Sequence, residues 1–347
     1  MPSAIGWDIG GANLKAARAE DGVIVAVVQT PCAPHSGVAQ IETALRETRA
    51  ALGVVDRHAV TMTAELSDAF PDRTRGVVQI AAICANELGA SNLAFFAGAR
   101  GLVSRAAVAD AASSIASANW RVSAEIAARA CGEALFIDVG STTTDIIPIS
   151  ERAVTARGED DNSRLAFGEL VYTGLLRGSP AAGLARAPLR GCWTQLVDEQ
   201  FATMADVHRI LNNIPEGADM LPTADGRPKS VAASRARLAR LVGCDAADAT
   251  PEEWDALAAF LARAQWRRIE DQIALIASRA PFAARAPLIG AGVGRRLVCE
   301  FARREGRDYR DIKEFFATAN DVSGVADCAP ACALALLALE KSAGALR

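Results

Sequence analysis

The sequence predicts an α/β protein of two domains, each built on an antiparallel hairpin unit plus helices. A chain of 347 residues is long enough for two domains, and 51% hydrophobic residues allow a large core. The third observation is a pattern that occurs twice. The pattern consists of an apolar strand, Asp-x-Gly, three small or polar residues and then a charged residue. It occurs in residues 4–17 (AIGWDIGGANLKAA) and again in residues 136–149 (FIDVGSTTTDIIPI). Repetition of a supersecondary unit is a stronger signal than either copy alone.

The first half of the chain alternates apolar strand patterns with helical periodicity. Two strands surround the first glycine turn, and the β-branched run GVIVAVVQ gives a third, so the chain opens with an antiparallel meander. The expected strands are 3–9, 13–19, 22–29, 58–65 and 93–98, and the expected helical segments are 38–52, 77–88 and the alanine-rich 105–130.

The second half restarts this pattern. Thr250, Pro251 and Glu253 form a capping box with proline at the first helical position, and Pro281 ends this longest helix. The apolar run near Ala329–Leu339 predicts a buried final helix. The expected strands are 134–139, 145–149, near 152–157 and 286–292; the expected helices are 203–213, 231–243, 250–280, 295–305 and 329–342; residues 161–200 are loop-rich.

The second copy of the strand and turn pattern begins at about residue 131, and this predicts the domain boundary there. We expect an N-terminal domain of residues 1–130 with the first glycine turn. The C-terminal domain, residues 131–347, would hold the second turn, a helical insertion at about 160–285 and a glycine-rich loop.

Bulk composition excludes several classes of protein. The net charge is −4, from 37 basic and 41 acidic residues, which argues against a general nucleic-acid binder. No apolar run is long enough to span a bilayer, and no secretory signal is visible, so we expect a cytoplasmic protein that does not bind membranes. Eight cysteines without a CxxC pair predict buried thiols in a reducing compartment. The three histidines lack HxH or HExxH spacing, so a histidine-ligated zinc centre is not expected.

The two glycine turns predict a phosphate-binding site. Backbone amides in a Gly/Ser/Thr turn form an anion cradle, and hydroxyl groups add donors. A carboxylate at a strand end can hold Mg²⁺, usually through water. Two facing turns could therefore hold a polyphosphate and its metal, although each could also be an ordinary hairpin turn. No GxxxxGK[ST] motif is present, so the site is not a P-loop.

A third glycine-rich stretch, LIGAGVGRRL at 288–297, follows an apolar strand and opens a helix. It lacks the full GxGxxG of a dinucleotide fingerprint. Gly290 and Gly292 indicate either a close approach of the backbone to a nucleotide or tight packing between strand and helix.

Taken together, these stretches resemble the actin/Hsp70/sugar-kinase superfamily. Its two phosphate loops and adenosine loop match the two turns and the Gly290 loop in order. Six stretches resemble one branch of this superfamily, the hydantoinase/oxoprolinase-related proteins linked to tetrahydromethanopterin-dependent one-carbon metabolism. The stretches are WDIGGANLKAA, TMTAELSDAF, DVGSTTTDIIPI, GELVYTGLLRGSP, FATMADVHRILNNIPEGAD and TADGRPKS. The resemblance implies two ribonuclease-H-like (actin-like ATPase) domains with a central cleft.

The same resemblance implies a transferase of methanofuran or methylofuran biosynthesis. Such an enzyme joins a phenolic acceptor of tyramine or tyrosine type to aminomethylfuran diphosphate and releases diphosphate. The small-molecule partners are the furan diphosphate and the phenolic amine, and the cofactor is Mg²⁺. Whether ATP binds stays open, and so does the oligomeric state, with a homo-oligomer among the options.

That chemistry assigns roles to the residues of the turns. Asp8 and Asp138 would position Mg²⁺, and Lys15 could contact the leaving group. The residues expected to bind phosphate or nucleotide are Asp8, Gly10, Gly11, Asn13, Lys15, Asp138, Gly140, Ser141, Thr142, Thr143, Asp145, Gly290 and Gly292.

The phenol has a pKa near 10, so a base must accept its proton. Candidates for this base are Glu65, Asp68, Asp225 and Lys229, whereas the expected catalytic role of Lys15 is the contact to the leaving group. Each has a structural alternative: Glu65 and Asp68 could cap a helix, Asp225-Gly226 is a common turn, and Lys229 could simply be solvated.

Tyr172 and Thr173 are the expected substrate-binding residues. Tyr172 is either a stacking wall for the furan or a core aromatic residue.

Two rival functions remain. One is an ATP-using enzyme, either a small-molecule kinase or a hydantoinase/oxoprolinase-type hydrolase. The other is a non-catalytic nucleotide sensor, which would not need the polar loops at 167–180 and 223–230.

Overall fold

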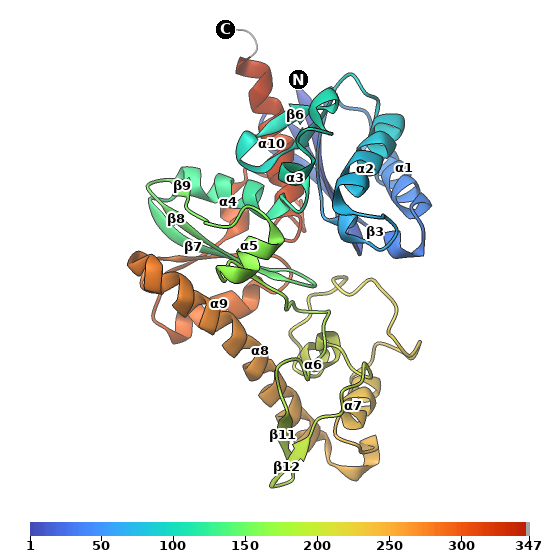
Figure 1. The fold of residues 1–347 in the computed structure, drawn as a ribbon, viewed down its shortest axis with the longest axis vertical. Helices are drawn as coiled ribbons and strands as arrows, with labels where there is room; N and C mark the ends of the chain where they lie inside the picture. Colours follow the sequence, from blue (N-terminus) through green and yellow to red (C-terminus); the bar gives the residue numbers. More distant parts are fainter. Residues whose placement is uncertain (345–347) are drawn as a thin grey trace. The chain divides into compact units, whose positions relative to one another are not determined.

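A computed structural model describes residues 1–344, with side chains to residue 340. The chain divides into two compact units (Figure 1). The first comprises Met1–Phe136, Ile147–Ala166 and Arg310–Arg347, and the second comprises Ile137–Ile146 and Phe167–Tyr309. These units are defined by packing, whereas the boundary near residue 131 rests on the repeated hairpin pattern and stays a prediction.

The first unit contains a six-stranded mixed sheet of order β3-β2-β1-β4-β5-β6. Its first three strands form the predicted antiparallel meander, and β4 and β5 continue the sheet in parallel with β1. β6 is an antiparallel edge strand that the sequence did not predict. The strands are β1 (Ser3–Ile9), β2 (Asn13–Glu20), β3 (Val23–Pro31), β4 (Arg57–Met62), β5 (Leu93–Phe96) and β6 (Leu102–Ser104).

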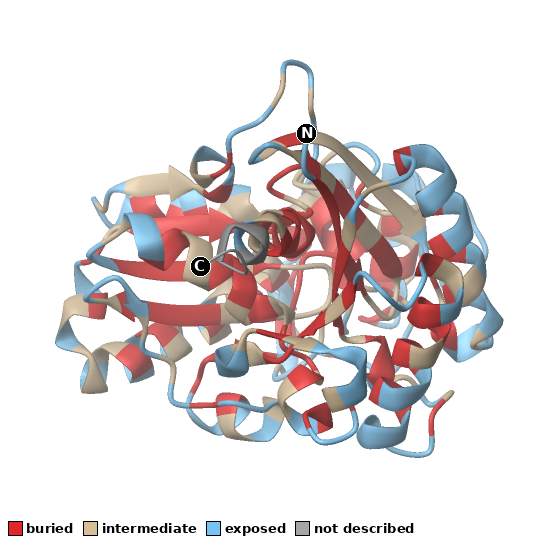
Figure 2. Ribbon diagram, turned by 90° about the horizontal axis from the view of Figure 1, so that it is seen from above, coloured by how far each residue is buried: buried red, intermediate tan, exposed pale blue. Residues whose placement is uncertain are grey.

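Helices pack on both faces of this sheet, and β1 has a different kind of side chain for each face. Ile5, Trp7 and Ile9 join the core with α1 (Ala39–Leu52) and α2 (Arg73–Leu88). The alternate residues are small because α10 (Ala329–Gly344) approaches closely: a Cβ at Gly6 would overlap the Ala331 carbonyl oxygen. Figure 2 shows the strands and α10 buried, and the outward faces of α1 and α2 exposed. The prediction of a buried final helix is confirmed.

The prediction of helical structure over 105–130 is only partly correct. The segment forms three short pieces: a 3₁₀ turn at Arg105–Ala107, α3 (Ala112–Ile115) and α4 (Asn119–Ala130). The chain breaks between α3 and α4 at Ser117, whose φ of +51° lies in the left-handed region and cannot continue a helix. The alanine-rich composition favoured a helix, but tertiary contacts of Ser117 override that propensity.

A second sheet has the order β10-β8-β7-β13-β14, with β9 paired to β8. The boundary between the two units runs through β7 and β8. These two strands and β13 were predicted; the short β10 and β14 were not. The bounds are β7 (Glu133–Val139), β8 (Thr144–Ser150), β9 (Ala153–Val154), β10 (Leu170–Val171), β13 (Leu288–Ala291) and β14 (Tyr309–Asp311).

The helices of the second unit agree with the predicted segments. The Thr250 hydroxyl accepts from the Glu253 amide at 3.3 Å, while Glu253 Oε2 accepts from the Thr250 amide at 2.8 Å, so the predicted capping box is formed. The helices are α6 (Met204–Ile210), α7 (Val231–Arg240), α8 (Pro251–Arg279) and α9 (Arg295–Arg304).

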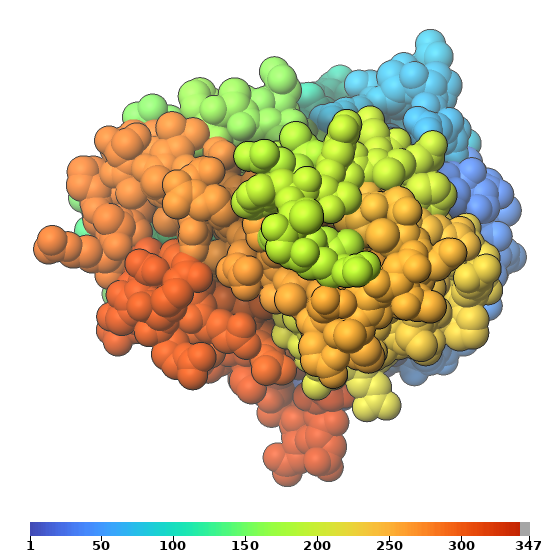
Figure 3. Space-filling view, turned by 90° about the horizontal axis from the view of Figure 1, so that it is seen from below, coloured from blue at the N-terminus to red at the C-terminus, as the bar shows by residue number. Residues whose placement is uncertain are grey.

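The region expected to be loop-rich, 161–200, also holds α5 (Asp161–Ala166) and the hairpin of β11 (Arg186–Leu189) and β12 (Cys192–Gln195). The hairpin turns at Arg190-Gly191, where both φ values are positive. Side chains of β11, α6 and α7 share an apolar core with the first turns of α8. In Figure 3 these yellow-green and gold segments lie packed together.

The cysteine prediction is only partly correct. All eight thiols are free, and Cys32, Cys84, Cys328 and Cys332 are buried. Cys192 and Cys299 are exposed, however, and Cys131 and Cys244 are half-buried, so the expectation that all eight are buried is wrong. Within residues 1–344, no helix combines the length and apolar character needed to cross a bilayer.

We expect Gly6→Ala to lower the free energy of unfolding by about 1–3 kcal/mol, because the added methyl group would force α10 away from β1. Chemical denaturation measures the effect. Gly132→Ala is the matched control, since nothing lies within 4 Å of a Cβ there. Equal stability of the two variants would contradict the close packing of α10 on β1.

Candidate functional site

The two glycine turns close in the same way. The Gly10 amide donates to the Asn13 carbonyl at 3.0 Å, and the Gly140 amide donates to the Thr143 carbonyl at 2.9 Å. A Cβ would lie 2.7 Å from Asn13 O at Gly10 and 3.2 Å from Thr143 O at Gly140, so both turns have little room for a side chain at their first position. The shared hydrogen bond extends the sequence repeat to the level of geometry.

The middle of each turn keeps its donors available. Among the described residues, the amides of Gly11, Ala12, Ser141 and Thr142 donate no hydrogen bond. Nothing lies within 4 Å of a Cβ at Gly11, so this backbone is open to a ligand. Free amides in a small-residue turn are the donors that an anion requires.

The first turn lies at the carboxyl end of β1, beside the end of β4. These strands are parallel, so their ends meet, and the Thr63 amide donates to the Ile9 carbonyl at 2.9 Å. Asp8 is buried and lies opposite Lys15 in the register of β1 and β2. The Lys15 ammonium donates to the Asp327 carbonyl at 2.7 Å. The structure therefore brings Asp8, Lys15 and the turn together.

Two buried oxygen atoms near this turn lack partners within the described part of the chain: Asn13 Oδ1 and Thr61 Oγ1. Such acceptors fit a hydrated cation. No group of three His, Cys, Asp or Glu side chains that could hold a metal occurs among the described residues. Mg²⁺ usually keeps several waters and takes only one or two carboxylates, so Asp8 and Asp138 fit its chemistry. They belong to different units, and their joint binding of one ion stays a prediction.

Glu65 is the most unusual of the predicted base candidates. It lies on a 3₁₀ turn, Ala64–Leu66, just after β4, and is 2% exposed. Burial raises the pKa of Glu65 to about 7, and the neighbouring Asp161 carboxylate adds to the increase; hydrogen bonds from Ser117 act in the opposite direction. A carboxyl group with a pKa near neutrality can both accept and release a proton under ordinary conditions.

Ser117 determines which oxygen of Glu65 is available. Its amide and its hydroxyl group lie 2.8 and 2.9 Å from Glu65 Oε1, whereas Oε2 is buried without a partner among the described residues. The hydroxyl group also lies 3.3 Å from Asp161 Oδ2, and Arg73 pairs with that carboxylate at 3.0 Å. The strained φ of Ser117 serves this contact, since the left-handed turn presents both donors to one oxygen.

The capping alternative for Glu65 is wrong. The N-cap of α2 is Asp72, whose carboxylate accepts from the Arg75 amide at 2.8 Å. Asp68, the other candidate of this stretch, is exposed, so the two residues differ sharply in environment. Sequence reasoning missed Ser117, because nothing local links it to a residue 52 positions earlier.

The second turn is held from behind by residues 173–177. The Leu175 amide donates to the Gly140 carbonyl, and the Leu176 and Arg177 amides both donate to the Ser141 carbonyl, at 2.9–3.0 Å. A Cβ at Gly174 would lie 2.6 Å from the backbone of Ser141 and Thr142, which explains the glycine. Because the Gly140 and Ser141 carbonyl groups already accept hydrogen bonds, the groups of the turn left for a ligand are mainly amide and hydroxyl donors.

A buried glutamine supports this segment. Gln265 of α8 donates to Thr173 Oγ1 at 2.9 Å and to the Gly174 carbonyl at 2.7 Å, and its Oε1 lies 2.8 Å from His208 Nε2. Burial lowers the pKa of His208, which keeps the ring neutral. Thr144 Oγ1 donates to the Thr173 carbonyl at 2.7 Å. The predicted substrate residue Thr173 is thus part of the scaffold, and Gln265 gave no sequence signal.

The glycine-rich loop packs against the end of β7. A Cβ at Gly292 would overlap Asp138 Oδ1, and one at Gly290 would lie 2.6 Å from the Tyr309 hydroxyl. The Gly294 amide donates to the Val139 carbonyl at 2.8 Å. Tight packing, one of the two alternatives, therefore accounts for these glycines, and a nucleotide role stays a prediction. Asp145 lies on β8, opposite Leu170 of β10.

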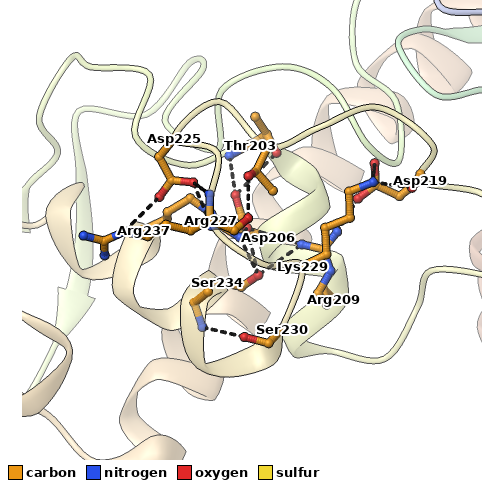
Figure 4. A network of polar contacts seen from close by, with 12 residues as sticks. Thr203, Asp206, Arg209, Asp219, Asp225, Arg227, Lys229, Ser230, Ser234 and Arg237 are labelled. Atoms are coloured by element: carbon orange, nitrogen blue, oxygen red, sulfur yellow. Dashed lines mark hydrogen bonds and ion pairs between the residues drawn. The ribbon is translucent and has the colours of Figure 1, made fainter.

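Asp225 and Lys229 belong to a separate polar network (Figure 4). Asp225 accepts from the Arg237 guanidinium and the Arg227 amide, both at 3.1 Å, and the Lys229 ammonium donates to the Asp219 carbonyl at 2.6 Å. Gly226 has a positive φ, so the turn alternative for Asp225-Gly226 is confirmed. The contacts fasten the 212–230 loop to α6 and α7; a catalytic role for either residue stays a prediction.

Tyr172 is 64% exposed, so the core alternative is wrong. Its backbone is fixed, because the next residue, Thr173, is held by Gln265. An exposed ring on a fixed backbone, next to the residues that support the second turn, is suited to stacking on a substrate ring. This role stays a prediction.

Comparison with known proteins identifies the family. The family model for hydantoinase/oxoprolinase matches residues 56–341. The chain belongs to this family. The fold is of the predicted α/β class. A nucleotide-free structure of acetone carboxylase, from work on ATP-dependent acetone carboxylation, is similar over 95% of this chain and 70% of its own, with a TM-score of 0.56 and 11% identity.

Two curated relatives share one name, (4-{4-[2-(γ-L-glutamylamino)ethyl]phenoxymethyl}furan-2-yl)methanamine synthase. The protein from Methanocaldococcus jannaschii is 33% identical over 244 residues, which cover 70% of this chain and 72% of the relative. The protein from Methanococcus vannielii is 34% identical over 112 residues, or 32% of this chain and 50% of the relative.

We expect Gly292→Ala to destabilise the protein more than Gly306→Ala does. The difference in the free energy of unfolding should be about 1–3 kcal/mol. Both glycines have a positive φ, so backbone strain is matched, but only at Gly292 would the methyl group displace Asp138. Denaturant titration compares the two variants. Equal losses would mean that the loop does not press on the end of β7.

Glu65 makes stability depend on pH. Because the folded state holds the Glu65 proton more tightly than the unfolded chain does, its contribution is complete below about pH 4.5 and is lost as the pH rises through about 7. Relative to Glu65→Gln, the wild-type free energy of unfolding should fall by about 2–3 kcal/mol between pH 5 and pH 8. Glu199→Gln, at an exposed position, serves as the control and should show no such difference. A parallel pH dependence of wild type and Glu65→Gln would contradict the raised pKa.

Proposed function

We propose that this protein is a transferase of methanofuran-type cofactor biosynthesis, which joins a phenolic acceptor to aminomethylfuran diphosphate and releases diphosphate. The observation that carries the proposal is 33% identity to a synthase whose name gives a product with a phenoxymethyl-furan ether. The two amide-rich turns support it from the side of the structure, because a diphosphate leaving group needs such donors.

The reaction breaks the bond between the furfuryl carbon and the diphosphate oxygen, and the electron pair leaves with diphosphate. The phenol oxygen then bonds to that carbon and forms the aryl ether. Amides of Gly11 and Ser141 and the hydroxyl groups of Thr142 and Thr143 would bind phosphate oxygens. Asp8 and Asp138 would hold Mg²⁺, which neutralises the charge of the departing diphosphate.

Glu65 is the proposed acceptor of the phenol proton. Its Oε2 has no partner among the described residues, its pKa is raised to about 7, and it follows β4 directly beside the first turn. Ser117 holds Oε1 and leaves Oε2 to take the proton. The exposed ring of Tyr172 would stack on the furan or the phenol.

An ATP-dependent kinase or a hydantoinase/oxoprolinase-type hydrolase is the second candidate, and the family match supports the hydrolase. The discriminating observation is the fate of each phosphate compound. ATP hydrolysis stimulated by a small hydroxyl or amide compound, without diphosphate release from the furan, would support this second function.

The decisive assay offers the purified protein Mg²⁺, aminomethylfuran diphosphate and either tyramine, γ-glutamyltyramine or tyrosine. We expect diphosphate release together with an aryl ether detected by mass spectrometry, at pH 8, where Glu65 is ionised. A parallel sample receives ATP. The absence of ether with all three acceptors would contradict the transferase assignment.

Asp138→Ala should lower turnover by about 100-fold or more, because the variant loses a metal ligand, and circular dichroism should show that the variant still folds. Asp198→Ala, at an exposed position of the same unit, is the control and should retain full activity. Near-normal turnover of Asp138→Ala would remove Asp138 from the site.

A further inference from the structure

The second turn, residues 140–143, offers an anion many donors but contains no Lys or Arg. Its amides and the hydroxyl groups of Ser141, Thr142 and Thr143 are neutral, and the nearest charged strand residue, Asp138, is an acid. Lys15 belongs to the other unit and donates to the Asp327 carbonyl. A diphosphate carries several negative charges, and neutral donors bind it less strongly than charged ones do.

The segment that holds this turn ends in an arginine. The Arg177 amide donates to the Ser141 carbonyl at 2.9 Å, and this carbonyl belongs to the turn itself. The backbone of Arg177 is therefore fixed against the proposed phosphate-binding residues. Its neighbours hold it on both sides: Leu175 and Leu176 are buried with Val293 of the glycine-rich loop, and the Met204 amide donates to the Gly178 carbonyl.

The side chain of Arg177 is not used by the fold. It is partly exposed, and it forms no hydrogen bond, ion pair or ring contact with any residue that the structure describes. Other arginines of the same unit are engaged: Arg237 pairs with Asp206, and Arg279 pairs with Glu169. A fixed backbone with a free guanidinium group is what an anion-binding arginine requires, because little ordering of the chain is left for the ligand to impose.

We propose that Arg177 is the cationic phosphate ligand of the second turn. Its guanidinium group binds oxygens of a diphosphate whose other oxygens accept from the Ser141 and Thr142 amides. Arginine suits this position because its planar fork binds two phosphate oxygens at once. The support of residues 173–177 by Gln265 then has a functional reason, since it holds the cation and the amides in one rigid piece. The inference rests on the proposed function only for the identity of the anion.

The test uses inorganic pyrophosphate with Mg²⁺ and the full-length protein, with affinity measured by isothermal titration calorimetry. Arg177→Ala and Arg177→Gln should bind about 10- to 100-fold more weakly than wild type, as expected for losing a charge-assisted hydrogen bond. Arg177→Lys should fall between them and wild type, because the charge stays and the fork is lost. Melting temperatures should stay close to wild type, since no hydrogen bond or ion pair with a described residue is removed.

Arg303→Ala is the matched control. Arg303 is exposed in the last turn of α9, and its side chain forms no hydrogen bond or ion pair with any described residue. Its replacement by alanine changes the net charge by the same amount as Arg177→Ala. Its pyrophosphate affinity should equal that of wild type.

The outcomes separate this inference from the proposed function. Weakened binding in Arg177→Ala with unchanged Arg303→Ala supports the arginine site, even if no furan ether is formed in the transfer assay. A loss of less than threefold in Arg177→Ala overturns it, even if the transfer is observed. Failure of the wild-type protein to bind pyrophosphate overturns both the arginine site and the phosphate turns.

Discussion

One hydrogen bond, repeated in both halves of the chain, is the constraint on which the site depends. In each turn the first glycine donates its amide to the carbonyl of the residue three positions on, at 3.0 Å in one case and 2.9 Å in the other. This bond closes the turn and leaves little room for a Cβ at Gly10 or Gly140. Among the described residues, no acceptor faces the amides of the next two residues, so these amides are free to bind an anion.

The two turns are stabilised differently, although they close alike. The first lies against the end of β4 and beside a buried carboxyl group, Glu65, whose orientation depends on Ser117. The second is tied back by residues 173–177, which in turn are held by Gln265. One unit therefore holds a buried carboxyl group with a raised pKa, and the other holds a turn whose amides are free to donate. A transfer reaction that expels diphosphate and deprotonates a phenol would need both.

Sequence patterns predicted the architecture well where the signal is local. The meander, the restart at β7, the capping box of α8 and the buried α10 depend on neighbouring residues and on hydrophobic periodicity. Errors arose where distant contacts override propensity, as in the segment 105–130, which Ser117 breaks. The cysteines show the same limit: Cys192 and Cys299 look like core thiols in composition, but their exposure depends on the packing of the second unit.

The sequence by itself determined the repeat, the glycines of the two turns and the family that the sequence motifs indicate. These follow from local sterics, because a turn that closes on its own fourth residue admits only a small first residue. Only the tertiary structure distinguished buried Glu65 from exposed Asp68, joined Gln265 to Thr173, and placed the Arg177 amide on Ser141. Burial and pairing between residues far apart in the chain depend on how strands and helices pack, and no pattern of neighbouring residues encodes them.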